Sequence, residues 1–307
     1  MKRTQNKYDL VVVGGGHAGI EAALIAHKRG VKTLLVSMDK KSVGRTSCNP
    51  AVGGLAKGQM VKEVDVLGGI MGFFADLSTL QSKTLNKSKG RSVWSPRSQI
   101  DKKLYEKIAQ KYIKEQGLDV LEGEVVSLNI KKDSICGVFL KDGSEVVCSA
   151  AVLTCGTFLN GLIHIGSEQI NAGRYGEKRA EGVTENLNSL GLKNGRLKTG
   201  TPPRIKKSSV NWKRAKLDMA MKSPPLFLIE QTTFLQKTNP VFLLEPTQTH
   251  TTLFWTIFRH QLCILENKWL PDLGTVLQLK TKYINLIKTL LMFYNLSQSG
   301  QCLNKYM

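Results

Sequence analysis

The sequence lacks several features that would assign it to a specialised class of protein. Its six cysteines form no CxxC pair and no dense cluster, so neither a zinc motif nor the disulfide framework of a small secreted domain is indicated. No apolar run reaches the roughly 18 residues that a bilayer span requires, and the first residues do not resemble a signal peptide. With 307 residues, 41% hydrophobic and 22% charged, we expect a reduced, cytoplasmic protein of one or two domains, without metal.

Glycine becomes scarce in the last part of the chain. Of 28 glycines, 26 lie in residues 1–218, and only Gly274 and Gly300 follow. The last 89 residues also hold one alanine and one aspartate, but six of the ten phenylalanines. Because compact domains rarely change composition so sharply, either a second domain begins near residue 219 or the coding sequence is altered there.

Acidic residues are absent from two stretches of this chain, whose net charge is +20. The bases in residues 77–100 are Lys83, Lys87, Lys89, Arg91 and Arg97, and those in residues 186–217 are Lys193, Arg196, Lys198, Arg204, Lys206, Lys207, Lys213, Arg214 and Lys216. Such stretches suit a phosphate-bearing ligand or an RNA backbone. A solvated basic face explains the charges equally well, and the 33 lysines against 11 arginines also fit an A-rich genome.

The clearest motif is a strand–loop–helix–strand unit near the start of the chain. Residues 8–13 form an apolar, β-branched run that predicts a buried parallel strand. Gly14-Gly15-Gly16-His17-Ala18-Gly19 follows directly, then a helical pattern over 20–29 that Gly30 ends, and a second strand over 31–36. This order is typical of a dinucleotide-binding βαβ unit.

Three glycines of the motif have predicted roles. Gly14 permits the tight turn, Gly16 lets the backbone approach a pyrophosphate, and Gly19 allows close packing of helix on strand. The acid usually found at the end of the second strand is missing. Ser37 stands there, and Asp39 is the alternative residue for the ribose hydroxyls.

Further α/β elements are predicted in the rest of the first 218 residues. A helix is expected over 101–116, strands over 120–121 and 124–128, a hairpin of 135–140 with 145–148, and a buried parallel strand over 150–154. The fold class is therefore α/β, Rossmann-like and three-layered around a parallel sheet, with a smaller β-rich region inserted.

Cys48 lies in a glycine-rich loop, residues 47–58, that leads into a predicted helix over 59–67. A buried structural cysteine and a reactive thiolate near Lys57 are equally good interpretations of the loop alone.

The sequence resembles the GidA/MnmG family of FAD-dependent enzymes that modify the wobble uridine of tRNA. The segments that carry the resemblance are residues 14–19, 47–58, 62–69, 88–90, 152–159 and 195–204. The resemblance implies that the loop from Gly14 to Gly19 holds the FAD pyrophosphate, Val125 the adenine end, and Gly156 and Thr157 the flavin. It also implies that Cys48 is one of two catalytic cysteines, acting as nucleophile or acid–base partner at the pyrimidine ring.

The same resemblance implies co-substrates and partners. They are NADH, methylene-tetrahydrofolate, tRNA, a GTPase of the MnmE type and a second copy of the chain. Two alternatives stay open: a flavoprotein like the folate-dependent tRNA uridine methyltransferase, or a non-catalytic fragment that binds dinucleotide or RNA.

The resemblance ends at Asp218, and a change of reading frame is the hypothesis we favour. Read one base out of register, the codons from Asp218 permit His-Gly-Asp-Glu-Lys-Pro, and those of residues 273–283 permit Arg-Tyr-Cys-Pro-Ser-Ile-Glu-Asp-Lys-Ile, both family motifs. We therefore expect an incomplete FAD-binding domain over 1–218 and an irregular out-of-frame tail over 219–307, without the second cysteine and without activity. A true C-terminal domain is the competitor, because residues 281–294 have some helical spacing.

Overall fold

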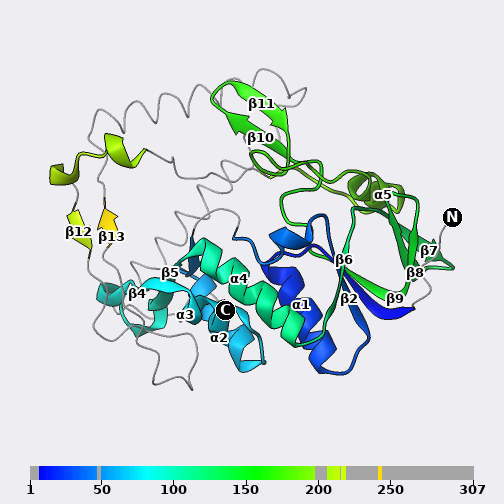
Figure 1. Ribbon diagram of the computed structural model, residues 1–307, viewed down its shortest axis with the longest axis horizontal. Coiled ribbons are helices and arrows are strands. Elements are labelled where there is room, and N and C mark those ends of the chain that lie inside the picture. The colour runs from blue at the N-terminus through cyan, green and yellow to red at the C-terminus, as the bar shows by residue number, and fades with distance from the viewer. Residues whose placement is uncertain (1–6, 47–49, 198–205, 215, 219–240, 244–307) are drawn as a thin grey trace, which may run out of the picture. The chain divides into compact units, whose positions relative to one another are not determined.

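The computed structural model describes residues 7–46, 50–197, 206–214, 216–218 and 241–243 of the chain (Figure 1). The chain divides into two compact units, Met1–Glu245 and Pro246–Met307, and all described residues belong to the first. Within the predicted tail, Val241–Leu243 (β13) pairs antiparallel with Lys216–Asp218 (β12). The rest of residues 219–307 lies outside the described residues.

A six-stranded sheet forms the centre of this unit. Its strands, in spatial order, are β6 (Asp119–Glu122), β2 (Thr33–Ser37), β1 (Tyr8–Val13), β9 (Glu145–Leu153), β8 (Ser134–Leu140) and β7 (Val125–Lys131). The first four are parallel, and β9 continues into an antiparallel ladder with β8 and then β7. The α/β, Rossmann-like fold with a parallel sheet is thus confirmed.

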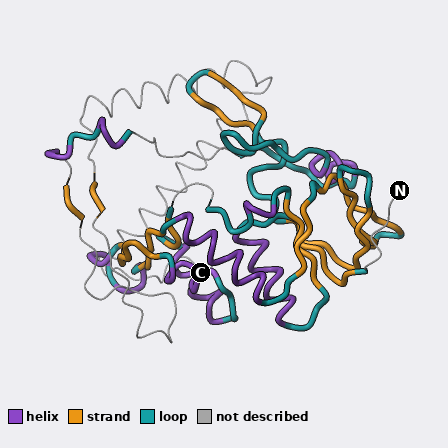
Figure 2. The backbone as a smooth tube through the Cα atoms, in the orientation of Figure 1, coloured by secondary structure: helices purple, strands orange, loops and turns teal. Residues whose placement is uncertain are grey.

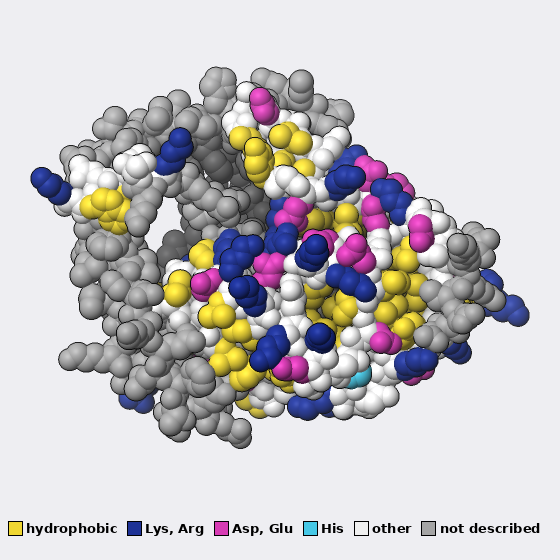
Figure 3. Space-filling model, viewed as in Figure 1, with side chains coloured by type: hydrophobic (Ala, Val, Ile, Leu, Met, Phe, Trp, Pro, Cys, Tyr) yellow, Lys and Arg dark blue, Asp and Glu magenta, His cyan; other side chains and the backbone are white. Residues whose placement is uncertain are grey.

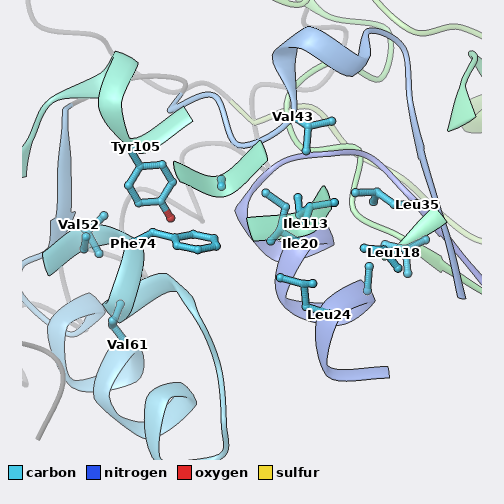
Figure 4. Close-up of a cluster of buried hydrophobic side chains, with 14 of the residues drawn as sticks. Ile20, Leu24, Leu35, Val43, Val52, Val61, Phe74, Tyr105, Ile113 and Leu118 are labelled. Atoms are coloured by element: carbon cyan, nitrogen blue, oxygen red, sulfur yellow. The ribbon is translucent and has the colours of Figure 1, made fainter. Parts of the chain in front are cut away.

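Both faces of β2 and of the second half of β1 are buried, which explains their continuous apolar runs. Val12 and Leu35 face one hydrophobic cluster with helices α1 (His17–Lys28) and α4 (Lys102–Glu115), while Val11 and Leu34 face a second cluster. In the first cluster, Figure 4 shows side chains from both helices meeting residues of the sheet. The second cluster includes side chains of β7, β8 and α5 (Val183–Ser189).

Four glycines of the chain lie where helices end. Gly30 has φ +80°, its N–H bonds to the His27 carbonyl, and the next N–H, of Val31, bonds to the Ala26 carbonyl. This is a Schellman cap, in which the left-handed residue is best supplied by glycine. The same pair of bonds follows α2, α4 and α5, with Gly68, Gly117 and Gly191 at the left-handed position. Val31 therefore belongs to the cap, and the second strand begins at Thr33 rather than at residue 31.

A smaller sheet forms the inserted β-rich region. It contains β3 (Ala51–Gly53), β5 (Ser95–Ile100) and β4 (Thr79–Leu85) in antiparallel order, and α2 (Lys57–Val66) packs on it. Helix α3 (Met71–Leu77) packs against both α2 and α4. Its N-terminus is held by Glu21 of α1, whose carboxylate accepts the Ile70 N–H at 3.0 Å and the Met71 N–H at 2.6 Å. Glu21 thus ties the insertion to the first helix.

The remaining elements are short. A hairpin of β10 (Leu162–Ile165) and β11 (Glu168–Asn171) follows the sheet, and five 3₁₀ turns are assigned among the described residues. These turns are η1 (Lys40–Ser42), η2 (Lys87–Lys89), η3 (Arg91–Val93), η4 (Lys207–Ser209) and η5 (Trp212–Arg214). Figure 2 shows helices and strands distinguished by colour along the backbone. None of the helices in the described part of the chain has the length and apolar character needed to cross a membrane.

Candidate dinucleotide-binding site

Gly14 and Gly19 close the loop between β1 and α1 through backbone packing. Gly14 has φ +112°, donates its N–H to the Val36 carbonyl at 2.8 Å, and leaves only 2.6 Å between an added Cβ and the Thr154 carbonyl oxygen. A Cβ on Gly19 would overlap the Gly14 carbonyl oxygen. Both positions therefore require glycine for the fold itself, as the sequence predicted for the turn and for helix–strand packing.

Gly16 differs from Gly14 and Gly19 because the space beside it is open. It is the N-cap of α1 in an extended conformation, and a Cβ built on it meets no atom within 4 Å. No side chain caps the helix, and no acid stands in its first turn. The free N–H groups and the positive end of the helix dipole are thus available to an anion that approaches Gly16.

His17 begins α1 and is held by Tyr105 of α4. The Tyr105 hydroxyl lies 3.2 Å from His17 Nδ1, and the two rings meet edge to face at 5.3 Å. Burial, and then the charge of Arg174, lowers the pKa of His17, while burial raises that of Tyr105. The lowered pKa favours the neutral imidazole, and the tautomer of His17 decides whether the phenol O–H or the Nδ1–H donates in this hydrogen bond.

A network of charged side chains lies beside this histidine. Arg45 pairs with Glu106 at 3.1 Å and with Glu177 at 3.0 Å, and Glu177 also lies 3.9 Å from Arg174. The Arg174 guanidinium lies 5.3 Å from the centre of the Phe158 ring, and its buried Nε has no hydrogen-bond partner. The network joins α4 to the turn after β11, and sequence reasoning did not identify it because its members are scattered along the chain.

The end of β2 is occupied by Ser37, which is buried and lies beside Gly15. Its hydroxyl donates to the Asp39 carbonyl at 3.0 Å, and the Asp39 carboxylate accepts the Lys41 N–H at 2.8 Å as the cap of η1. A second acid, Glu122 at the end of β6, accepts the Lys40 N–H at 3.1 Å. Asp39 and Glu122 thus both place carboxylates beside the 39–41 turn, and Glu122 was not identified from the sequence.

Val125 lies close to this end of the sheet. It is the first residue of β7, and the nearby Gly123 donates its N–H to the Ser37 carbonyl at 2.8 Å. Its side chain is buried in the second cluster. The residue as a whole is only 4% exposed.

The segment after β9 lies against the glycine loop. The Thr154 hydroxyl bonds the carbonyls of Val13 and Gly14, at 2.9 and 3.1 Å, and its N–H bonds the Val13 carbonyl at 2.8 Å. Gly156 and Thr157 follow, both exposed, and Gly156 has φ +60° with open space beside it. Since the carboxyl ends of β1, β2 and β9 meet here, the structure brings residues 14–19 and 154–157 together at the edge where dinucleotides bind in such sheets.

Cys48, the predicted catalytic residue, lies outside the described residues. Burial raises the pKa of Cys148 and of Cys155, so neither is a reactive thiolate at neutral pH. In the part of the chain that the structure describes, no cluster of three or more His, Cys, Asp or Glu is placed to hold a metal ion.

A separate cavity of about 480 Å³ lies among α1, α4 and the turn between α2 and α3. Its lining includes Glu21, Asp65 and Tyr112, but none of the predicted cofactor residues. The candidate dinucleotide site is thus separate from this cavity.

The family of the chain follows from comparison with known proteins. A family profile described as "Glucose inhibited division protein A" (GIDA) matches residues 9–268. The chain belongs to the GidA family. This GidA-family chain is 47% identical over 207 residues to the tRNA uridine 5-carboxymethylaminomethyl modification enzyme MnmG of Protochlamydia amoebophila, covering 67% of this chain and 33% of that protein. It is 48% identical over 209 residues to MnmG of Bdellovibrio bacteriovorus, and the match covers 68% of this chain and 33% of that protein.

A solved structure supports the same relationship. The structure of Aquifex aeolicus GidA in its form II crystal matches with a TM-score of 0.72 at 41% identity, covering 75% of this chain and 38% of that one. This GidA-family chain therefore spans about a third of the length of the curated relatives that it matches. The profile match extends past Asp218, where sequence reasoning placed the end of the resemblance.

Proposed function

We propose that this chain is the FAD-binding part of an enzyme that modifies uridine in tRNA. The observation that carries the proposal is the open space at Gly16, where the N-terminus of α1 has no side-chain cap and a Cβ would meet no atom of the described residues within 4 Å. Flavin dinucleotides carry a pyrophosphate of the size and charge that such a helix N-terminus accepts. The relatives' name, tRNA uridine 5-carboxymethylaminomethyl modification enzyme, supplies the substrate class and favours it over the methyltransferase alternative.

The residues fit such a cofactor in three places. The backbone from Gly14 to Gly19 would hold the pyrophosphate, and His17, whose lowered pKa favours the neutral form, would add no charge there. The backbone of Val125, with Ser37 or Asp39, would hold the adenosine end. Gly156 and Thr157 would lie by the flavin, which when bound supplies two-electron redox chemistry.

The finer parts of the proposal come from the family resemblance. They are NADH and methylene-tetrahydrofolate as co-substrates, a GTPase of the MnmE type as partner, a homodimer, and attack on the uridine ring by Cys48. We also propose that residues 219–307 are an out-of-frame product, so that the chain as translated lacks the second cysteine and is inactive. Sequencing the DNA around the codons of Asp218 and Met219 tests this proposal. If the codons of residues 219–307 lie in a reading frame continuous with an unrelated gene, the proposal is refuted.

Gly16→Ala is the variant that tests this site. Because the added methyl group meets no protein atom, we expect the variant to fold, with a loss of FAD affinity of tenfold or more. Fluorescence quenching of FAD during titration with the full chain measures that affinity. The matched control is Gly195→Ala, at another glycine with no atom within 4 Å of an added Cβ.

The control variant should bind FAD as the wild type does. Equal affinity of Gly16→Ala and the wild type would contradict the pyrophosphate site. Failure of the wild-type chain to bind FAD at all would contradict the proposed cofactor.

A further inference from the structure

The basic residues of the first acid-free stretch gather on one exposed tip. Residues 87–94 connect β4 to β5 through the turns η2 and η3, and all eight are exposed. The tip carries three bases, Lys87, Lys89 and Arg91, and no acid. Among the residues that the structure describes, none of the three bases forms an ion pair.

Trp94 gives this tip an aromatic surface. Trp94 is 38% exposed, and the Arg91 guanidinium carbon lies 5.8 Å from the ring centroid. The indole Nε1–H donates to the Lys87 carbonyl at 3.2 Å, and the Trp94 N–H donates to the Arg91 carbonyl at 3.2 Å. The tryptophan is therefore fixed to its own loop while part of the ring stays in solvent.

The base of the tip is anchored to the insertion. Gln59 of α2 donates to the Trp94 carbonyl at 3.2 Å and accepts from the Ser95 hydroxyl at 3.1 Å. β5, which begins at Ser95, pairs with β3, in the glycine-rich segment that follows Cys48 in the sequence. The tip thus connects two strands of the same small sheet to which this segment contributes β3.

We propose that the tip, residues 87–94, is a docking surface for RNA, with Lys87, Lys89 and Arg91 on phosphates and Trp94 stacked on an unpaired base. Unpaired bases and closely spaced phosphates are what single-stranded loops of RNA present. An acidic protein would also pair with three bases, but the indole held beside an arginine offers in addition the stacking surface that an unpaired base uses. The proposal deepens the proposed function, on which it rests, by naming the surface that would bring tRNA to the insertion. The face shown in Figure 3 carries both basic and acidic side chains, whereas the charged residues of the tip are all basic.

The test measures binding of the full chain to a fluorescently labelled, unmodified tRNA by anisotropy at several salt concentrations. In the triple variant Lys87→Ala, Lys89→Ala, Arg91→Ala, we expect affinity to fall about tenfold or more near 0.1 M salt. The slope of log K against log salt should also fall by about 2, since each lost phosphate contact on single-stranded RNA removes roughly 0.7. Trp94→Leu should lower affinity about fivefold or more through lost stacking, and Trp94→Phe much less.

A matched control removes the same charge elsewhere. Lys107→Ala, Lys111→Ala, Lys114→Ala takes three exposed bases from α4 and should leave both affinity and slope close to the wild type. The exchange Lys87→Arg, Lys89→Arg, Arg91→Lys keeps the charges and should keep binding.

Four outcomes would overturn the proposal. Equal losses in the two triple variants would show that only net charge matters, and competition by poly-glutamate as strong as by tRNA would indicate an acidic protein instead. Wild-type chain that does not bind tRNA would contradict the tRNA part of the proposed function as well, whereas tRNA binding that survives loss of the tip would contradict this surface alone.

Discussion

Replacing Gly14 by alanine should destabilise the chain before any cofactor is considered. Gly14 has φ +112°, a conformation that a side chain disfavours, and the new Cβ would lie 2.6 Å from the Thr154 carbonyl oxygen. That oxygen belongs to backbone at the end of β9, which is held to β1 by the Thr154 hydroxyl and N–H. The contact therefore cannot be relieved by turning a side chain away.

The expected cost combines the two effects. A residue forced out of the right-handed regions costs about 1–2 kcal/mol, and overpacking that displaces backbone costs about 1–3 kcal/mol. The sum, about 2–5 kcal/mol, is a large part of the total stability of about 5–15 kcal/mol that is usual for a domain. Gly16→Ala, by contrast, should cost no more than about 1 kcal/mol, because alanine is only a poorer N-cap than glycine.

Urea unfolding without flavin measures the difference. At a slope of about 2 kcal/mol per M, the Gly14→Ala midpoint should fall by at least about 1 M, while that of Gly16→Ala should stay within about 0.5 M of the wild type. Equal midpoints for Gly14→Ala and the wild type would refute the assignment of Gly14 to fold packing and Gly16 to ligand access.

The remaining predictions concern His17 and Glu21. Burial lowers the pKa of His17 below 6.5, so the unfolded chain binds more protons than the native one, and stability should fall as pH drops below about 6.5. His17→Asn should reduce that pH dependence in urea midpoints taken from pH 7.5 to 5, and an unchanged dependence would contradict the buried, neutral histidine. Glu21→Ala removes the acceptor for the Ile70 and Met71 N–H groups and should cost about 1–2 kcal/mol in the same assay. Glu21→Gln keeps an acceptor oxygen and should cost less, and equal losses in the two variants would contradict the capping role.

The first βαβ unit was predictable because its signals are local. The apolar runs, the glycine spacing and the stop at Gly30 each depend on residues a few positions apart, and the structure confirms strand, helix and strand in that order. The boundaries shifted where hydrogen bonds decide them. α1 begins at His17 because Gly16 serves as its N-cap, and α2 begins at Lys57 rather than at residue 59.

The contacts that complete the site were not predictable from spacing. Tyr105 meets His17 across 88 positions, and Thr154 meets Gly14 across 140. Only the expectation that the ends of parallel strands share one edge pointed toward Thr154, and nothing in the sequence marked Tyr105, Arg174 or Glu122. The role of Cys48 and the origin of residues 219–307 stay predictions.

Amide hydrogen exchange of the wild-type chain, with and without FAD, tests the central claim most directly. The account predicts that FAD slows exchange in peptides covering residues 14–20 and 154–157, and leaves the β8–β9 turn, residues 141–144, unchanged. FAD that binds without protecting residues 14–20 would contradict the site.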